Sequence, residues 1–391
     1  MRKKNIAFLL GVIAALTALV FWLVTPFGSP NVPSGLVFSS LDYSFEQNGP
    51  IKEAQENPED AAAASPIRVF ACDWQDPSKS EISDRSHQEF FDSQNQKRVE
   101  IAESLMQSND PEHLLAAALV GFDRKSKEHI AAMEKALAAD PDNPITLWNF
   151  LYACSLNAEE TLCQDGGIEK RAVLADGGNG ALWGRIAGYR FRRGDTARLI
   201  DALIKANAAP QFNRYFIEQV EMLERGYVAA SDYSYQERIM NAISIMVGNT
   251  SDLIGVYNGC KEQAAESAEW LQPCIEYGKR LERDGRTILA ALLGIAIQKE
   301  MHEISGDAKK KAETDHRRWL LNDSMNSAIR MDGQVLVLDD EHVLADFIAE
   351  WSAHGELRAH QFVHEEVVRL SKQPGYNPCK SIEENSVQTP E

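Results

Sequence analysis

Apolar side chains recur every three or four positions along most of the chain from residue 84 onward. That interval places them on one face of a helix, whereas the strict alternation of apolar and polar residues typical of strands is scarce. Short breaks interrupt the pattern, among them Asp110-Pro111 and the segment 140–144. An Asp followed by proline is a typical helix start, because proline needs no hydrogen bond in the first turn. The pattern therefore predicts an all-α fold.

The expected helices divide into two regions. Residues 84–230 contain a recurring pattern, whereas residues 231–375 form a second helical region without an alignable repeat, followed by a disordered tail at 376–391. In the later part of the chain, apolar spacing and the positions of Gly, Asn, Asp and Pro predict helices at 213–229, 235–247, 260–270, 273–283, 286–303, 308–330, 340–352 and 356–371.

Residues 6–24 are apolar and uncharged, and they follow Arg2, Lys3 and Lys4. About 19 helical residues at about 1.5 Å each nearly match the ~30 Å hydrocarbon core of a bilayer, so the segment is long enough to span it. Because positive residues stay on the cytoplasmic side, residues 1–5 are expected inside the cell and the rest of the chain outside. A cleaved signal peptide is the alternative, but no Ala-x-Ala-like site precedes residue 30.

Residues 25–83 connect this segment to the helices. Prolines at 26, 30, 33, 50 and 58 occur among Gly, Ser, Glu and Gln, a composition that predicts a mostly disordered tether because it cannot bury a core. A short extended segment is expected at 68–74, where Cys72 would attach it to the fold.

The six cysteines form an even set, which outside the cytoplasm indicates a disulfide framework. Short separations close with little loss of entropy, so the spacing favours Cys154 with Cys163 and Cys260 with Cys274. Cys72 and Cys379 remain, and they either pair with each other or stay free.

Two segments, 136–144 and 172–180, match at four of nine positions with an offset of 36 residues. Each is followed within four residues by a tryptophan, Trp148 or Trp183. A two-helix repeat with a period in this range is the signature of a helical solenoid. At these residues, over about 110–213, the chain resembles tetratricopeptide repeat proteins.

Ala136 and Pro141 fit the second-helix alanine and closing proline of that family's motif, while Trp183, Gly194 and Ala206 fit its leading Trp, mid-repeat Gly and second-helix Ala. The chain departs from the motif at His129, at Gly177 and in a cysteine-bearing insertion. The layout is also loosely similar to uncharacterised envelope proteins of proteobacteria, a resemblance that implies no activity. With the apolar segment 6–24, we expect a single-pass protein of the bacterial inner membrane whose bulk lies in the periplasm.

The resemblance also implies a binding surface, because the first helix of each tetratricopeptide unit lines the inner surface. Trp148 and Tyr152 fall on that helix in one unit, and Arg185, Tyr189 and Arg192 in the next. These five residues are the candidate groove, in which Arg would bind carboxylates or acidic peptides. The alternative is that the arginines pair with neighbouring acidic residues within the fold.

Candidates for chemistry are few. His360 and His364 stand four apart on a predicted helix, a spacing that can hold a divalent metal, but Gln361 occupies the position where a zinc hydrolase motif requires Glu. A solvated polar face is the favoured interpretation, so the two histidines are weak metal candidates. The usual nucleophile and phosphate-binding motifs are absent from the sequence, and neither a catalytic residue nor a cofactor is expected.

Net charge is −18, and a surface this acidic repels phosphate backbones, which excludes nucleic acid as an expected partner. We therefore expect a membrane-tethered helical-repeat scaffold that binds a protein or peptide partner in the cell envelope, without catalysis. Two alternatives remain: a hydrolase that uses carboxylates on an all-α fold, and a structural subunit whose helices pack against identical copies.

Overall fold

The computed structural model describes residues 84–124, 126–157, 163, 166–248, 251–329, 331–373 and 376. In these residues the regular structure is helical, apart from one isolated bridge between Asn179 and Gln211, which confirms the all-α prediction. The apolar segment 6–24, the tether 25–83, Cys72 and Cys379 lie outside the described residues.

The chain divides into two compact units. One consists of Met1–Asp84 with Val367–Glu391, and nearly all of it lies outside the described residues. The other, Arg85–Glu366, holds most of both predicted helical regions within one body.

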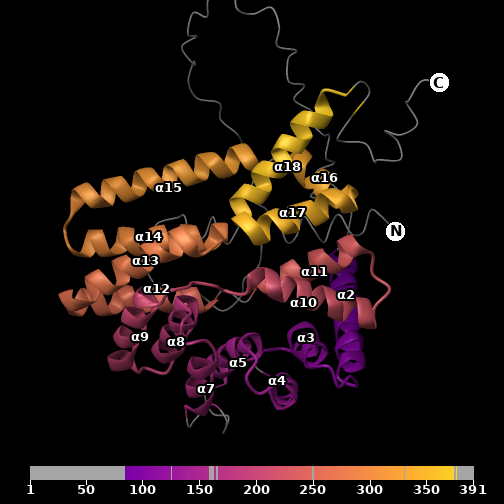
Figure 1. Ribbon diagram of the computed structural model, residues 1–391, viewed down its shortest axis with the longest axis horizontal. Coiled ribbons are helices and arrows are strands. Elements are labelled where there is room, and N and C mark those ends of the chain that lie inside the picture. Colours follow the sequence, from indigo (N-terminus) through magenta and orange to yellow (C-terminus); the bar gives the residue numbers. More distant parts are fainter. Residues whose placement is uncertain are drawn as a thin grey trace, which may run out of the picture. The chain divides into compact units, whose positions relative to one another are not determined.

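The first half of this body consists of consecutive helix pairs (Figure 1). Within it α3 packs on α4, α5 on α7 and α8 on α9, and α5 also packs on α8. The bounds are α2 Asp84–Leu105, α3 Pro111–Gly121, α4 Lys127–Ala139, α5 Pro144–Leu156, α7 Gly167–Asp176, α8 Gly180–Arg192 and α9 Thr196–Ala208.

The first helix of each pair begins at a similar side-chain cap. Asp110, Asn143 and Asn179, which are 33 and 36 positions apart, precede α3, α5 and α8, and each side chain accepts hydrogen bonds from backbone N–H groups of the first turn. Such caps satisfy donors that have no partner inside the helix. The breaks that the sequence pattern predicts at 110 and 140–144 are therefore helix starts.

The remaining helices are α10 Phe216–Ala230, α11 Tyr235–Val247, α12 Ser251–Glu266, the 3₁₀ turn η2 Ala268–Trp270, α13 Leu271–Asp284, α14 Ile288–Ile304, α15 Ala308–Ala328, α16 Met331–Asp339, α17 Glu341–His354 and α18 Glu356–Ser371. Two predicted helices, 235–247 and 356–371, coincide with α11 and α18. The predicted helix 308–330 ends earlier, at Ala328, and the separate α16 is absent from the sequence-based prediction.

The helix predicted at 260–270 begins nine residues earlier, as α12. Gly255 and Gly259 disfavour helix by propensity, but both lie where α12 packs closely on α8 and α9. A Cβ on Gly255 would contact the backbone of Gly188 at 3.4 Å, and a Cβ on Gly188 would come within 2.7 Å of the carbonyl oxygen of Asp252. The glycines therefore serve helix–helix packing, which local sequence cannot reveal.

Helix α8 is the centre of this packing. All its residues from Gly180 to Arg190 are buried, because α5, α7, α9 and α12 surround it. Elsewhere in the described part, Tyr235–Glu266 is long and apolar enough to cross a membrane, and 60% of its most apolar window is buried among the other helices.

Candidate functional site

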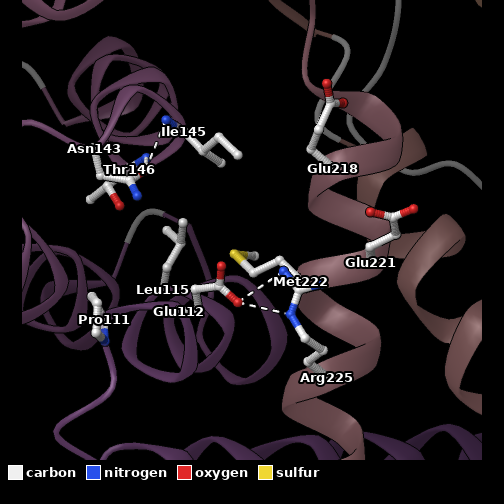
Figure 2. Close-up of a pocket in the computed structure, with 10 residues that line it drawn as sticks. All are labelled: Pro111, Glu112, Leu115, Asn143, Ile145, Thr146, Glu218, Glu221, Met222 and Arg225. Atoms are coloured by element: carbon white, nitrogen blue, oxygen red, sulfur yellow. Dashed lines mark hydrogen bonds and ion pairs between the residues drawn. The ribbon is translucent and has the colours of Figure 1, made fainter. Parts of the chain in front are cut away.

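A cavity of about 180 Å³ lies between α3, α5 and α10 (Figure 2). We call it the α10 cavity, because four of its residues come from one face of that helix, at helical spacings of three and four. Its lining consists of Pro111, Glu112, Leu115, Asn143, Ile145, Thr146, Glu218, Glu221, Met222 and Arg225.

The base of the α10 cavity is apolar. Leu115 is 2% exposed and Met222 3% exposed, and Ile145 adds a further aliphatic side chain. The backbone donors of the α5 N-terminus are already satisfied, because the Asn143 side chain accepts from the N–H groups of Ile145 and Thr146 at 3.0 Å. This wall therefore offers aliphatic surface to a ligand.

The rim of the α10 cavity is charged. Glu112 accepts a hydrogen bond from Nε of Arg225 at 2.9 Å and forms an ion pair with its Nη2, also at 2.9 Å, so these two charges compensate each other. Glu218 accepts from the Asn213 side-chain amide at 2.6 Å, and Glu221 is exposed. Within the described residues neither Glu218 nor Glu221 forms an ion pair with a cation. The cavity thus combines an apolar base with two uncompensated carboxylates.

The α10 cavity was not anticipated from the sequence. Glu218, Glu221 and Arg225 stand at helical spacing, which by itself indicates only a solvated helix face. The hollow arises because α3 and α5, more than 70 residues earlier in the chain, pack beside that face. No local signal contains that information.

The structure brings four of the five candidate groove residues together. The guanidinium of Arg185 lies 3.9 Å from the ring centroid of Trp148 and 5.4 Å from that of Tyr152, and Arg192 lies 5.8 Å from the Tyr152 ring. Arg124, which was not predicted, lies 5.5 Å from the same ring. These are cation–π distances. The four arginine and aromatic side chains of α5 and α8 form what we call the Arg185 cluster.

The Arg185 cluster is buried rather than open. Trp148 is 1%, Tyr152 6% and Arg185 2% exposed, while Arg192 is partly buried. Burial lowers the pKa of the Arg185 guanidinium to about 10, an effect that the nearby Asp252 carboxylate opposes. In this arrangement these four predicted groove residues contact one another, and the part of all five in binding a partner stays a prediction.

Asp252 provides the negative charge of this region. One carboxylate oxygen lies 3.6 Å from Arg185, and the other lies 3.3 Å from Arg214. The carboxylate is 6% exposed and comes from α12, so its ion pair with Arg185 joins α12 to α8, and its ion pair with Arg214 joins α12 to the segment before α10. The sequence left open that the groove arginines pair with acidic residues inside the fold. Arg185 does so, because it forms an ion pair with Asp252.

Tyr189 has a different environment. Its hydroxyl donates to the carbonyl of Cys163 at 3.1 Å, and Arg193 donates to the same carbonyl. Cys163 forms a disulfide with Cys154, with Cα atoms 5.2 Å apart.

The second disulfide also has the predicted partners. Cys260 and Cys274 are bonded, with Cα atoms 5.9 Å apart, and the bond joins α12 to α13. Both predicted local pairs are therefore confirmed, while the state of Cys72 and Cys379 lies outside the described residues.

The two candidate histidines do not belong to a larger ligand set. His360 packs against the ring of Phe347, with centroids 5.1 Å apart, and burial lowers its pKa to about 4. The Nδ1 atom of His364 is buried without a hydrogen-bond partner. In the part of the chain that the structure describes, no group of three or more His, Cys, Asp or Glu side chains could hold a metal ion.

The chain matches no known protein-family model, no curated protein and no solved structure. The resemblance to tetratricopeptide repeat proteins therefore stays a prediction from the sequence. The α10 cavity and the Arg185 cluster are the two candidate sites that the geometry offers, and the cavity is the one with exposed charged residues at its rim.

Proposed function

We propose that this protein is a membrane-tethered helical scaffold that binds a protein or peptide partner in the cell envelope through the α10 cavity. The observation that carries the proposal is the pair Glu218 and Glu221, which lack a cationic partner within the described residues, above a base formed by Leu115 and Met222. Uncompensated carboxylates beside apolar surface favour a ligand that supplies both a cation and a hydrocarbon stem.

A lysine or arginine side chain of the partner meets that requirement. Its methylene stem packs on apolar surface while the charged end reaches the carboxylates. The cavity volume of about 180 Å³ is below the ~300 Å³ at which pockets for small-molecule ligands begin, which favours a single side chain over a whole metabolite. Arg225 stays paired with Glu112 and does not compete for Glu218 and Glu221.

The arrangement of helices supports a scaffold role. Helix pairs α3/α4, α5/α7 and α8/α9 follow one another, with similarly capped starts 33 and 36 residues apart, as expected for a solenoid of tetratricopeptide type. Helix α5 contributes Ile145 and Thr146 to the cavity and Trp148 and Tyr152 to the Arg185 cluster. In this proposal the Arg185 cluster holds α5 in position, and a bound partner extends from the α10 cavity along α5.

The location in the cell is part of the proposal. Residues 6–24, preceded by Arg2, Lys3 and Lys4, support an inner-membrane anchor with the helices on the periplasmic side. Two disulfides within the helical unit agree with an oxidising compartment. A composition that favours disorder at 25–83 would let the helices reach partners away from the membrane.

Selection of displayed random peptides on the purified protein tests the binding proposal. The protein should enrich peptides in which Lys or Arg stands next to apolar residues. The variant Glu218→Gln/Glu221→Gln should reduce that enrichment at least about tenfold, because two charge-assisted hydrogen bonds are lost. A matched variant, Glu134→Gln/Glu262→Gln, removes two exposed carboxylates elsewhere and should enrich the same peptides as the unmodified protein.

Two outcomes would contradict the proposal: no enrichment of cationic peptides, or equal enrichment by the protein and the Glu218/Glu221 variant. The hydrolase alternative receives less support from the same geometry. Carboxylate pairs in acid–base catalysis stand on opposite sides of the reacting bond, whereas Glu218 and Glu221 project from the same helix (Figure 2).

A further inference from the structure

Helix α15, Ala308–Ala328, is the most exposed long helix of the described unit. It packs along α14, and of its 21 residues Thr314 and Ala328 are buried. Trp319 is 59% and Leu320 46% exposed, which is unusual for large apolar side chains that stand next to each other. This face therefore resembles the core of an interface more than a solvated surface.

Most charges of α15 are compensated within the protein. Lys310 pairs with Asp307, Lys311 with Glu303, Lys299 with Asp315, and Arg317 with Glu282. Lys309, Glu313 and Asp323 differ, because all three are exposed and none forms an ion pair within the described residues. One uncompensated cation and two uncompensated carboxylates thus remain on the helix.

Lys309, His316 and Asp323 are spaced by seven residues, so they lie on one face of α15. The ring of His316, at the centre of this face, stacks on that of Trp319, with centroids 5.9 Å apart and planes 12° apart. Lys309 and Asp323 stand at the two ends, about 21 Å apart at 1.5 Å per residue. We call these residues, with Ala312 and Leu320, the α15 face.

We propose that the α15 face binds the same face of a second copy of this chain in an antiparallel, two-fold arrangement. With His316 at the axis, Lys309 of each copy lies opposite Asp323 of the other, so these two charges acquire partners. A self-complementary face is what two-fold symmetry requires. A parallel pairing would instead place Lys309 against Lys309 and Asp323 against Asp323. This inference does not rest on the α10 cavity.

The size of the face sets the strength of the association. A helix of 21 residues is about 31 Å long and about 10 Å wide, which offers roughly 300 Å² per copy. Stable interfaces bury about 800 Å² per partner, so α15 alone gives a weak dimer, with a Kd above about 10 µM. Attachment of both copies to one membrane would raise their effective concentration.

Charge reversal tests the pairing. Sedimentation of the full chain in mild detergent, over a wide range of protein concentration, should show a monomer–dimer equilibrium. Lys309→Asp and Asp323→Lys should each raise the dimer Kd about tenfold, because two attractive pairs become repulsive. The double variant Lys309→Asp/Asp323→Lys restores opposite charges across the axis and should recover the original Kd. Glu262→Lys, a matched reversal at an exposed site on α12, should leave the Kd unchanged.

Cross-linking tests the geometry. His316→Cys should be linked between copies by a short bis-maleimide, since the two residues meet at the axis. Leu174→Cys, at an 86% exposed position on α7, should not be linked between copies. A chain that stays monomeric at every concentration overturns the proposal. A dimer whose Kd is unchanged by both single charge reversals also overturns the proposal, because another surface, such as the apolar segment 6–24, then makes the contact.

Discussion

Asp252 is the residue on which two buried guanidinium groups depend. Arg185 and Arg214 each lie within 3.6 Å of its carboxylate, and all three side chains are at most 9% exposed. A buried charge that loses its partner is strongly destabilising, whereas the intact pair adds little net stability. The ion pairs therefore constrain how α8, α12 and the segment before α10 fit together more than they add to the free energy of unfolding.

Asp252→Asn should lower the free energy of unfolding by about 3–5 kcal/mol, because it leaves the charges of Arg185 and Arg214 uncompensated. Urea denaturation at neutral pH measures this change. Asp323→Asn, at an exposed position, should change the same quantity by less than about 0.5 kcal/mol. Equal effects of the two variants would show that Asp252 does not hold the arginines in solution.

The Arg185 cluster also shows which contacts can be predicted from the sequence. Helical spacing groups Arg185, Tyr189 and Arg192 on one helix, and the structure places Arg185 and Arg192 beside Tyr152. The same spacing says nothing of Asp252, which stands 67 positions after Arg185 and belongs to a helix that crosses α8. Burial of the cluster follows from that crossing, so it could not be predicted.

Helix α12 meets α8 where neither helix carries a side chain. Gly188 on α8 and Gly255 on α12 face each other, so the two backbones approach closely. Alanine ordinarily stabilises a helix by about 1 kcal/mol relative to glycine. At this crossing the sign should reverse, because a Cβ on Gly188 would lie 2.7 Å from the Asp252 carbonyl oxygen.

Gly188→Ala should therefore lower the free energy of unfolding by about 1–3 kcal/mol, since the added methyl separates the helices. The same denaturation experiment measures it. Gly178→Ala is the matched control, because a Cβ there would have no neighbour closer than 3.6 Å, and it should be tolerated. Stabilisation by Gly188→Ala would mean that the α8–α12 crossing is looser than described.

A second contact between elements involves a carboxyl group. Glu356, in the first turn of α18, accepts a hydrogen bond from the backbone N–H of Ile288 in α14 at 2.7 Å. Part of the residue is exposed, but its carboxyl group is enclosed, and this burial raises its pKa to about 7, against the opposing effect of the Ile288 hydrogen bond. The protonated form is thus favoured in the folded protein, while the unfolded chain ionises near pH 4.5.

The difference between the folded and unfolded pKa of Glu356 makes the free energy of unfolding depend on pH. The contribution of protonated Glu356 to stability is fully present below about pH 4.5 and is lost as pH rises to about 7, since only the unfolded chain releases the proton readily in that range. Glu356→Gln, which keeps an acceptor but cannot ionise, should match the unmodified protein at low pH. By pH 7.5 it should be more stable by up to about 3 kcal/mol. Thermal unfolding across pH 4.5–7.5 checks this. If the stability difference between the variant and the unmodified protein did not vary with pH, the Glu356 carboxyl group would be solvent-exposed.

At the element scale, apolar spacing predicts both α11 and α18. Helix α11 also begins at a local signal, because Ser234 forms a capping box with Glu237. The start of α12 was missed because Gly255 disfavours a helix by its own propensity, and its presence is explained by close packing against α8. The α10 cavity was missed for the same reason, since it depends on which helices lie beside α10.

At the scale of the whole molecule, topology and redox state are coupled. Residues 6–24 with Arg2, Lys3 and Lys4 predict that the helical unit lies outside the cytoplasm, and the disulfides Cys154–Cys163 and Cys260–Cys274 need an oxidising compartment to persist. Each bond closes a short loop and should stabilise the unit by about 2–4 kcal/mol. Misplacement in the cytoplasm would thus also destabilise the fold.

The last prediction follows from this coupling. In spheroplasts, protease added from outside should digest the helical unit of the full chain, while a cytoplasmic marker protein stays intact. A chain lacking residues 2–24 should be protected, and after denaturation its Cys154, Cys163, Cys260 and Cys274 should react with maleimide without prior reduction, whereas those of the denatured full chain should not. Protection of the full chain, or free thiols at these four positions in it, would contradict the periplasmic location. Digestion with intact disulfides would instead place the α10 cavity and the α15 face where envelope partners and second copies on the same membrane can reach them.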